Sequence, residues 1–232
     1  MRAWGGRSER ACRFSQPGME EDMIRSRSDL KEYLACERAL YFGSGEKNTI
    51  EQGGACEGIS GAAFLKARLQ AWLLRSKFHS IWKYLRTLRH AEYHKNQSGL
   101  VHRLLFVYYH RKKYVLGNRL GFEIPENCVG KGLMIYHIAP IVINEDARIG
   151  EYCCITGNFC AGNTGAGTPS PVLGDHVTTG WGSCVIGDVR VADHVVIGAG
   201  CVLTRSVEEG GARVAGVPGR KLAGSRLPGK EN

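Results

Sequence analysis

The chain has 232 residues, of which 43% are hydrophobic and 23% are charged, and its formal net charge is +9. This hydrophobic content excludes an intrinsically disordered chain, and the length is sufficient for one or two domains with a substantial core. No apolar stretch approaches the ~20 residues of a membrane-spanning helix, and the basic N-terminus lacks the hydrophobic segment of a secretory signal. We therefore expect a cytoplasmic protein without a membrane span.

The cysteines also favour the cytoplasm. There are nine of them, an odd number, and no two are spaced as in a CxxC pair. A disulfide framework is therefore not expected, and neither is a cysteine zinc site. We predict that most of these thiols serve as small apolar side chains, and no bound metal is expected.

Two differently built regions meet near Gly121. Residues 1–120 contain 22 Lys and Arg against 11 Asp and Glu, whereas residues 121–232 contain 9 against 11. Of the 31 glycines, 20 lie in the second region. The chain is accordingly predicted to divide into an extension that is disordered or precedes the true start (1–22), a helical N-terminal domain (23–118), a β domain (119–222) and a tail (223–232).

The first region has the pattern of amphipathic helices. Ser28 is the predicted N-cap of the first helix, with Asp29 in its first turn. Further along, apolar residues recur at steps of three and four and predict further helices; these are Leu65, Leu69, Trp72, Leu73, Ile81, Leu85, Leu88, Leu104, Leu105 and Tyr108. Gly117 and Asn118 are the predicted end of the last helix.

These helices are strongly basic. Between Gly61 and Leu120 there are 13 basic residues and a single acidic one, Glu92. Such a run is more often a solvated face than a nucleic-acid or membrane surface, and no nucleic-acid motif accompanies it, so no nucleic-acid partner is expected. Attraction to an acidic substrate, to phosphates or to an acidic neighbouring subunit would explain the charge equally well.

The second region contains a six-residue repeat. From Ile143 to Val207 an aliphatic or small residue recurs every six positions, followed four residues later by a second small or apolar residue, in ten units interrupted once. A period of six fits neither a lone helix nor an alternating sheet. It predicts a parallel β-helix in which three units form one triangular coil, and each coil hydrogen-bonds to the next. The fold class is therefore α+β by region.

The motifs IGAGCVL and VAGVPGR resemble the end of hexapeptide-repeat acyltransferases, whose fold is a left-handed parallel β-helix. The segment GFEIPENCVGKGLMIYHIAPIVINEDARIG is similar to the part of serine acetyltransferases where the helical domain meets the β-helix. The resemblance covers roughly residues 24–222. It implies transfer of an acetyl group from acetyl-CoA to the hydroxyl of L-serine, a step in cysteine biosynthesis, by a homotrimer or a dimer of trimers.

The resemblance also implies a catalytic pair. His137 matches the family's catalytic histidine and would act as the general base that removes the hydroxyl proton. Glu123 falls where these enzymes carry an acidic partner that orients the imidazole. The alternative interpretations are a histidine that caps a turn and an ordinary surface carboxylate.

Two predicted substrate-binding positions depart from the family pattern. Tyr136 stands where an aspartate usually precedes the catalytic histidine, and Ser170 stands where a second active-site histidine precedes a proline. The loop before Pro171 is also short. These departures weaken the case for free serine, and the pattern resembles divergent members encoded with surface-polysaccharide genes. A sugar hydroxyl is therefore the alternative acceptor.

The cofactor side follows the family more closely. Small residues would let the pantetheine of CoA approach the backbone in a groove between neighbouring β-helices, basic residues would meet its phosphates, and the turn at 162–165 would supply the oxyanion donor. The predicted cofactor-binding residues are Gly162, Thr164, Gly165, Gly180, Trp181, Ala199, Arg220 and Lys221. Arg213 is a further candidate for the phosphates.

Two functions of another class compete with acetyl transfer. His176 and His194 lie three repeat units apart, which places them at the same corner of successive coils, about 4.8 Å apart. Stacked histidines hold zinc in carbonic anhydrases of this fold, but a third ligand at this spacing is missing. A β-helix without catalysis, serving as an assembly or binding module, is the other alternative.

Overall fold

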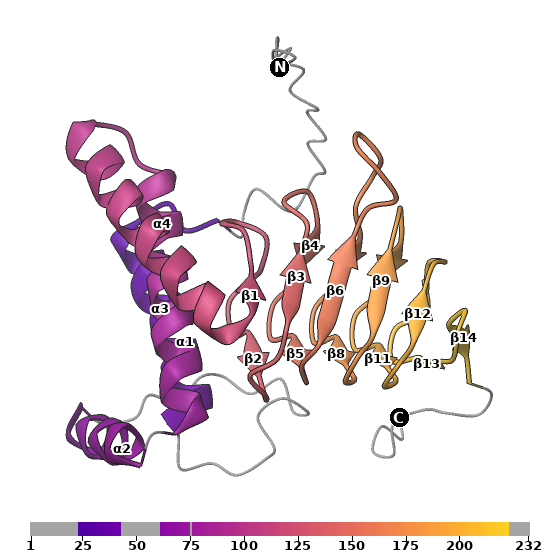
Figure 1. The fold of residues 1–232 in the computed structure, drawn as a ribbon, viewed down its shortest axis with the longest axis horizontal. Helices are drawn as coiled ribbons and strands as arrows, with labels where there is room; N and C mark the ends of the chain where they lie inside the picture. Colours follow the sequence, from indigo (N-terminus) through magenta and orange to yellow (C-terminus); the bar gives the residue numbers. More distant parts are fainter. Residues whose placement is uncertain (1–22, 43–60, 75, 223–232) are drawn as a thin grey trace, which may run out of the picture.

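A computed structural model describes residues 23–42, 61–74 and 76–222, and it shows a group of helices at one end of a three-sided stack of strands (Figure 1). The predictions for residues 1–22 and 223–232 lie outside the described residues. The helices are α1 (Arg27–Phe42), α2 (Gly61–Leu73), α3 (Lys77–Lys95) and α4 (Leu100–Leu120).

The β region consists of three sheets that form the sides of a prism. The sheets have the strand orders β1-β3-β6-β9-β12, β10-β7-β4 and β14-β13-β11-β8-β5-β2, and only the pair β13–β14 is antiparallel among the described pairings. The first sheet contains β1 (Phe122–Glu123), β3 (Ile141–Ile143), β6 (Phe159–Gly162), β9 (Cys184–Ile186) and β12 (Val202–Leu203). The second contains β4 (Arg148–Ile149), β7 (Val172–Leu173) and β10 (Arg190–Val191). The third contains β2 (Met134–Ile135), β5 (Cys154–Ile155), β8 (Thr178–Thr179), β11 (Val196–Ile197), β13 (Arg213–Ala215) and β14 (Arg220–Lys221).

The strand register confirms the predicted coil. Thr179 pairs with Ile197 and Val185 pairs with Leu203, so the partners in each pair are offset by three repeat units. The offset between Ile149 and Leu173 is four units, because the loop between β6 and β7 inserts one extra unit. This loop is the single interruption in the repeat.

Burial follows the same period. The first residues of the six units from Leu173 to Leu203 are all buried, and so are the residues four positions later as far as Cys201. Two inward side chains per unit fill the narrow core, so the prism is solid. The seven described cysteines are free thiols, five of them buried, which is consistent with their predicted use as small apolar side chains.

Two predicted helix ends are wrong by a few residues. Ser26, and not Ser28, caps α1, because its Oγ accepts the backbone N–H of Asp29 while the Asp29 carboxylate accepts the N–H of Ser26. The helix α4 continues through Gly117 and ends at Gly121, whose φ of 78° is left-handed. Gly117 serves close packing: a Cβ there would lie 2.4 Å from the carbonyl oxygen of Phe122.

The apolar stripes of two helices do not face the core as their spacing predicted. Among the described helices, α1 and α3 each have a buried face, which in α3 includes Ile81, Leu85 and Leu88. The stripe of α2 and that of α4 are exposed; the exposed residues include Leu65, Leu69, Trp72, Leu73, Leu104, Leu105 and Tyr108. Helical periodicity predicts an apolar face but not what covers it. The described helices include no candidate for a transmembrane segment.

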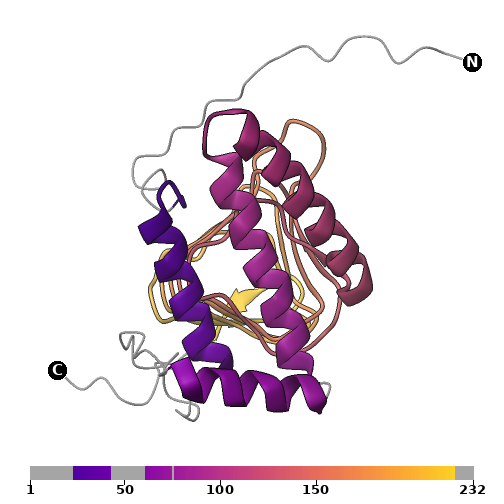
Figure 2. The same cartoon turned by 90° about the vertical axis from the view of Figure 1, so that its left-hand side faces the viewer.

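The helices α1, α3 and α4 stand side by side across the end of the prism, with α2 lying across the lower ends of α1 and α3 (Figure 2). The first coil would otherwise present backbone groups with no neighbouring coil to pair with. Side chains from the helices take that place: the Tyr41 hydroxyl accepts the N–H of Ile135, and the Lys113 ammonium donates to the carbonyl of Ile124.

Arg89 is the central residue of this junction. Its guanidinium is fully buried and donates to Glu37 of α1 and Glu92 of α3, at 2.7 and 3.0 Å. It also donates to the carbonyls of Val129 and Gly130 at the start of the prism, at 2.8 and 2.7 Å. One side chain therefore joins two helices to the first coil.

Replacing Arg89 should destabilise the whole chain. Arg89→Met leaves two buried carboxylates and two buried carbonyls without their donor, and we expect a loss of about 3–5 kcal/mol in the free energy of unfolding. Urea unfolding followed by circular dichroism measures it, with Arg103→Met on the exposed face of α4 as the matched control. A loss below about 1 kcal/mol would contradict the role given to Arg89.

Glu37 should make stability depend on pH. Burial raises the pKa of its carboxyl from 4.5 to about 7, although Arg89 lowers it, and its Oε2 has no partner among the described residues. Since the folded pKa is above the unfolded one, this group stabilises the fold below about pH 4.5, and the contribution is lost as the pH rises through 7. Relative to Glu37→Gln, the chain should lose up to ~3 kcal/mol between pH 5 and pH 8 in urea unfolding. An equal difference at both pH values would contradict this.

Candidate active site

His137 lies on the corner where the chain passes from β2 to β3 in the first complete coil. Ile135 before it and Ala139 after it are buried, whereas Tyr136, His137 and Ile138 are exposed. The buried neighbours fix the backbone of the corner, and the imidazole is left on the surface of the prism. His137 is therefore available to a substrate from solvent.

Trp181 lies against His137, although one coil lies between the two coils to which these residues belong. The two rings are nearly perpendicular, with centroids 5.8 Å apart, and Trp181 is 46% exposed. The intervening coil contributes Gly157 to this corner, where a Cβ would lie 2.7 Å from the indole. The absence of a side chain at Gly157 is what lets the indole lie along the corner and reach the histidine.

Lys77 is the third group at this corner. It is the first residue of α3, and its Nζ lies 3.2 Å from Nδ1 of His137. A lysine ammonium has only donors, so Nδ1 accepts and the neutral imidazole carries its proton on Nε2. In this arrangement neither ring nitrogen has a free lone pair with which to take a proton.

Glu123 occupies an exposed position on β1, which pairs with β3 just after the His137 corner. Within the parts of the chain that the structure describes, no hydrogen bond or ion pair joins Glu123 to His137. The predicted orienting role of Glu123 stays a prediction. The side chain that contacts the imidazole is that of Lys77, whose charge is opposite to that of Glu123.

The two predicted substrate-binding residues lie on different edges of the prism. Tyr136 is 37% exposed next to His137. Ser170 is buried at the corner between the first and second sheets, where its Oγ donates to the side-chain oxygen of Asn144 at 2.9 Å. The structure therefore does not bring Tyr136 and Ser170 together within one chain.

The loop after β6 is on the same edge as Ser170. Gly162 and Gly165 have open space where a Cβ would stand, or only ordinary contacts. The Thr164 backbone N–H is bonded to the Thr168 hydroxyl at 3.1 Å, so it would have to exchange this partner before serving an oxyanion. The open space at the glycines is compatible with a cofactor approaching here, and their role stays a prediction.

Glycine is required at position 180 by the packing of the chain itself. A Cβ at this position would lie 2.5 Å from the backbone nitrogen of Ala199 in the next coil. The close stacking of coils thus accounts for Gly180 without a cofactor. The same corner contains Trp181, so Gly180, Trp181 and Ala199 lie on the edge of His137 and not on that of Gly162.

The predicted phosphate-binding residues lie at the far end of the prism. Arg220 and Lys221 form the exposed strand β14. Lys221 is paired with Glu209, which neutralises one of the two charges. The Nε of Arg213 is buried and has no partner among the described residues.

His176 and His194 stack as the spacing predicted. Their ring centroids are 4.7 Å apart with an interplanar angle of 8°, and Tyr152 stacks on His176 at 5.4 Å. All three residues have positive φ, so they mark one turn repeated in successive coils. The described residues contain no group of three or more side chains suited to a metal ion.

Comparison with known proteins gives a consistent result. A stretch of 105 residues is 38% identical to the serine acetyltransferase of Synechococcus elongatus, covering 44% of this chain and 43% of that protein. A stretch of 152 residues is 31% identical to the serine acetyltransferase of Staphylococcus aureus, covering 61% of this chain and 62% of that protein. The matched stretches thus span less than two thirds of these relatives. No protein-family model matches the chain.

Solved structures show the same fold. The serine O-acetyltransferase of Brucella melitensis superposes with a TM-score of 0.56 at 21% identity, covering 88% of this chain and 71% of that one. The Neisseria gonorrhoeae serine acetyltransferase in complex with serine gives 0.55 at 22% identity, covering 85% and 71%. The chain is thus similar in sequence to serine acetyltransferases and shares the fold of their solved structures.

One neighbour of His137 could not be predicted from the sequence. Lys77 is separated from His137 by 60 residues, and no spacing or motif connects them. Trp181 was predicted to line a groove, but its contact with His137 follows only from the coil register, with Gly157 in between. Neither contact could be read from local sequence.

The contact from Lys77 predicts the tautomer of His137. In the wild-type protein the neutral imidazole should carry its proton on Nε2, and in Lys77→Met the share with the proton on Nδ1 should rise, because the donor to Nδ1 is gone. Long-range 15N–1H spectra of 15N-histidine-labelled protein measure this, with the His137 signals assigned from His137→Asn. Lys31→Met on the exposed face of α1 is the control. Identical His137 signals in Lys77→Met and wild type would contradict the contact.

Proposed function

We propose that this protein is an acetyl-CoA-dependent O-acetyltransferase of the serine acetyltransferase type, with L-serine as acceptor and O-acetyl-L-serine and CoA as products. The single observation that carries the proposal is the exposed imidazole of His137 on a prism corner, in the motif that matches the family's catalytic histidine. The curated relatives of the chain support it, since both are named serine acetyltransferases.

His137 would supply the general base. A neutral alcohol attacks a thioester poorly, so its proton must leave as the new C–O bond forms. His137 takes that proton, the tetrahedral intermediate collapses with cleavage of the C–S bond, and the proton passes to the departing CoA thiolate. The acetyl group ends on the hydroxyl oxygen.

The contact with Lys77 limits how this base can act. The lone pair of Nδ1 is occupied by Lys77, and Nε2 holds the proton. The base acts through Nδ1 once Lys77 has released it, or through Nε2 once an acceptor has replaced Lys77 at Nδ1. Glu123, on the strand beside the histidine corner, is the acceptor that we propose for the second route.

The placement of the predicted cofactor residues supports a site shared between copies. His137 and Trp181 lie on one edge of the prism, whereas Gly162, Thr164 and Gly165 lie on another. Two edges of one solid prism cannot contact the same small molecule, but the edges of two neighbouring prisms can. A trimer in which each groove combines the His137 edge of one copy with the loop edge of the next is therefore part of the proposal.

A sugar hydroxyl is the second candidate acceptor, and the surroundings of His137 favour it. Where a family aspartate would precede the histidine, the chain has Tyr136, and Trp181 presents a half-exposed ring on the other side. Tyr and Trp side chains provide a broad apolar face and one polar group at the end of the ring. They provide no carboxylate that could bind the amino group of serine. Such surroundings suit a ring of hydroxyl-bearing carbons.

The general-base role predicts a large loss on substitution. His137→Asn should reduce the rate of thiol release from acetyl-CoA, in the presence of acceptor, by about 10²–10⁴-fold, while acetyl-CoA still binds. His194→Asn is the matched control, since it removes an exposed histidine from another corner of the prism. Equal activity of His137→Asn and wild type would exclude His137 as the base.

The acceptor prediction is tested on the wild-type protein. Thiol release from acetyl-CoA should accelerate with L-serine, and mass spectrometry should detect O-acetyl-L-serine. Acceleration only by free or nucleotide-linked sugars would replace serine with the second candidate. Absence of turnover with every acceptor, together with no binding of acetyl-CoA, would contradict both and favour the non-catalytic module.

A further inference from the structure

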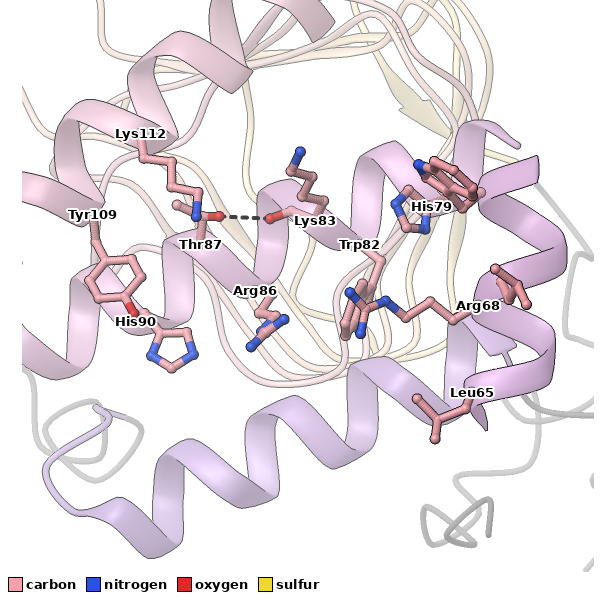
Figure 3. Close-up of a pocket in the computed structure, with 12 residues that line it drawn as sticks. Leu65, Arg68, His79, Trp82, Lys83, Arg86, Thr87, His90, Tyr109 and Lys112 are labelled. Atoms are coloured by element: carbon pink, nitrogen blue, oxygen red, sulfur yellow. Dashed lines mark hydrogen bonds between the residues drawn. The ribbon is translucent and has the colours of Figure 1, made fainter. Parts of the chain in front are cut away.

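A cavity of about 600 Å³ lies among the helices α2, α3 and α4, away from the candidate active site (Figure 3). None of its lining residues belongs to the His137 corner or to the predicted cofactor residues. Its volume falls in the range of about 300–1,000 Å³ that is typical of small-molecule sites. Residues of all three helices line the cavity, so it forms only when these helices are packed together.

Four cations converge on this cavity. Arg68 comes from α2, Lys83 and Arg86 come from α3, and Lys112 comes from α4. Among the described residues, none of the four is paired with a carboxylate. Every lining residue is neutral or basic, so the mutual repulsion of these charges has no compensation within the described part of the chain.

The two arginines converge on a single indole. The guanidinium carbons of Arg68 and Arg86 each lie 5.6 Å from the ring centroid of Trp82, so they are no farther from each other than twice this distance. Figure 3 shows Arg68 extending from α2 across Trp82, with Arg86 next to it. The fork of an arginine matches the oxygens of a phosphate, and both forks come from residues that line the same cavity.

Two buried nitrogen atoms of the lining have no partner among the described residues. These are Nε1 of Trp82, a residue that is 5% exposed, and Nδ1 of His79. A buried indole N–H is a donor that normally finds an acceptor. Both residues line the same cavity, so an acceptor bound there could satisfy the indole N–H.

The pKa values of the two histidines that line the cavity are lowered, in part by the same positive charges. Burial, followed by the charge of Arg86, lowers the pKa of His90 to about 4. Burial, then Arg68 and Lys83, lower the pKa of His79. Both rings are therefore neutral at pH 7, and an anion would meet four fixed positive charges and two neutral imidazoles.

We propose that this cavity binds a small molecule with a diphosphate group, held between Arg68 and Arg86 with Trp82 Nε1 as a further donor. Lys83 and Lys112 add charge at the rim. The diphosphate can come from inorganic pyrophosphate or from a nucleoside diphosphate, since both present the same oxygens. This site goes beyond the proposed acetyl transfer, and its test requires no activity.

Isothermal titration calorimetry of the full chain with pyrophosphate and with ADP tests the site. We expect both to bind, with affinity that falls as salt rises, and Arg68→Gln/Arg86→Gln to weaken binding by roughly tenfold per arginine. Tighter binding of ADP would show that the nucleoside adds contacts, whereas equal affinity would assign the site to the diphosphate alone. Arg103→Gln/Arg111→Gln, with the same loss of charge from the exposed face of α4, should bind as the wild type does.

Three results would overturn the proposal. They are no binding of either probe to the wild type, unchanged affinity in Arg68→Gln/Arg86→Gln with an unaltered circular dichroism spectrum, and loss of binding in Arg220→Gln/Lys221→Gln alone. The last result would place the diphosphate at the far end of the prism. Sedimentation of the same variants gives an independent check: a change in oligomeric state without a change in affinity would identify the cavity as a subunit interface.

Discussion

The buried guanidinium of Arg89 is the interaction on which the rest of the structure depends. A β-helix has an open end, where a coil has backbone groups but no further coil to pair with them. Arg89 closes that end with two hydrogen bonds to carbonyls, and its charge is balanced by Glu37 and Glu92. The helical domain therefore completes the prism.

The same contact fixes the position of the candidate active site. Lys77 and Arg89 belong to one helix, and the rise per residue of an α-helix places them about 18 Å apart along its axis. Arg89 holds α3 against the first coil at Gly130, and His137 follows in the same coil. Because the helix α3 is rigid, fixing it at Arg89 also fixes the position of Lys77 at its first residue. The buried ion pair of Arg89 thus sets the distance between Lys77 and His137, although it is remote from both side chains.

The prism was predictable from the sequence because its repeat is local. Each six-residue unit has inward-facing residues at the same two positions, so all ten units predict the same structure. The offset of three units between Thr179 and Ile197 follows from three units forming one coil. The helices were less predictable, since Leu65 and Leu104 have the spacing of a buried face but are exposed. Periodicity defines a stripe, whereas burial depends on a partner that sequence does not specify. His137 itself could be found from its motif, but Lys77, on a helix far away in the chain, could not.

The faces of α3 serve different purposes, and this explains why a basic helix can be a core helix. Ile81, Leu85 and Leu88 pack into the core, whereas His79, Lys83, Arg86 and His90 face the cavity at steps of three and four residues. Arg89 is only three residues from Arg86 in the sequence, but its side chain lies on the other face of α3, against the carboxylates of Glu37 and Glu92. The positive charges of α3 therefore have two kinds of surroundings. The charge of Arg89 is neutralised within the fold, whereas those at the cavity are left without a carboxylate among the described residues.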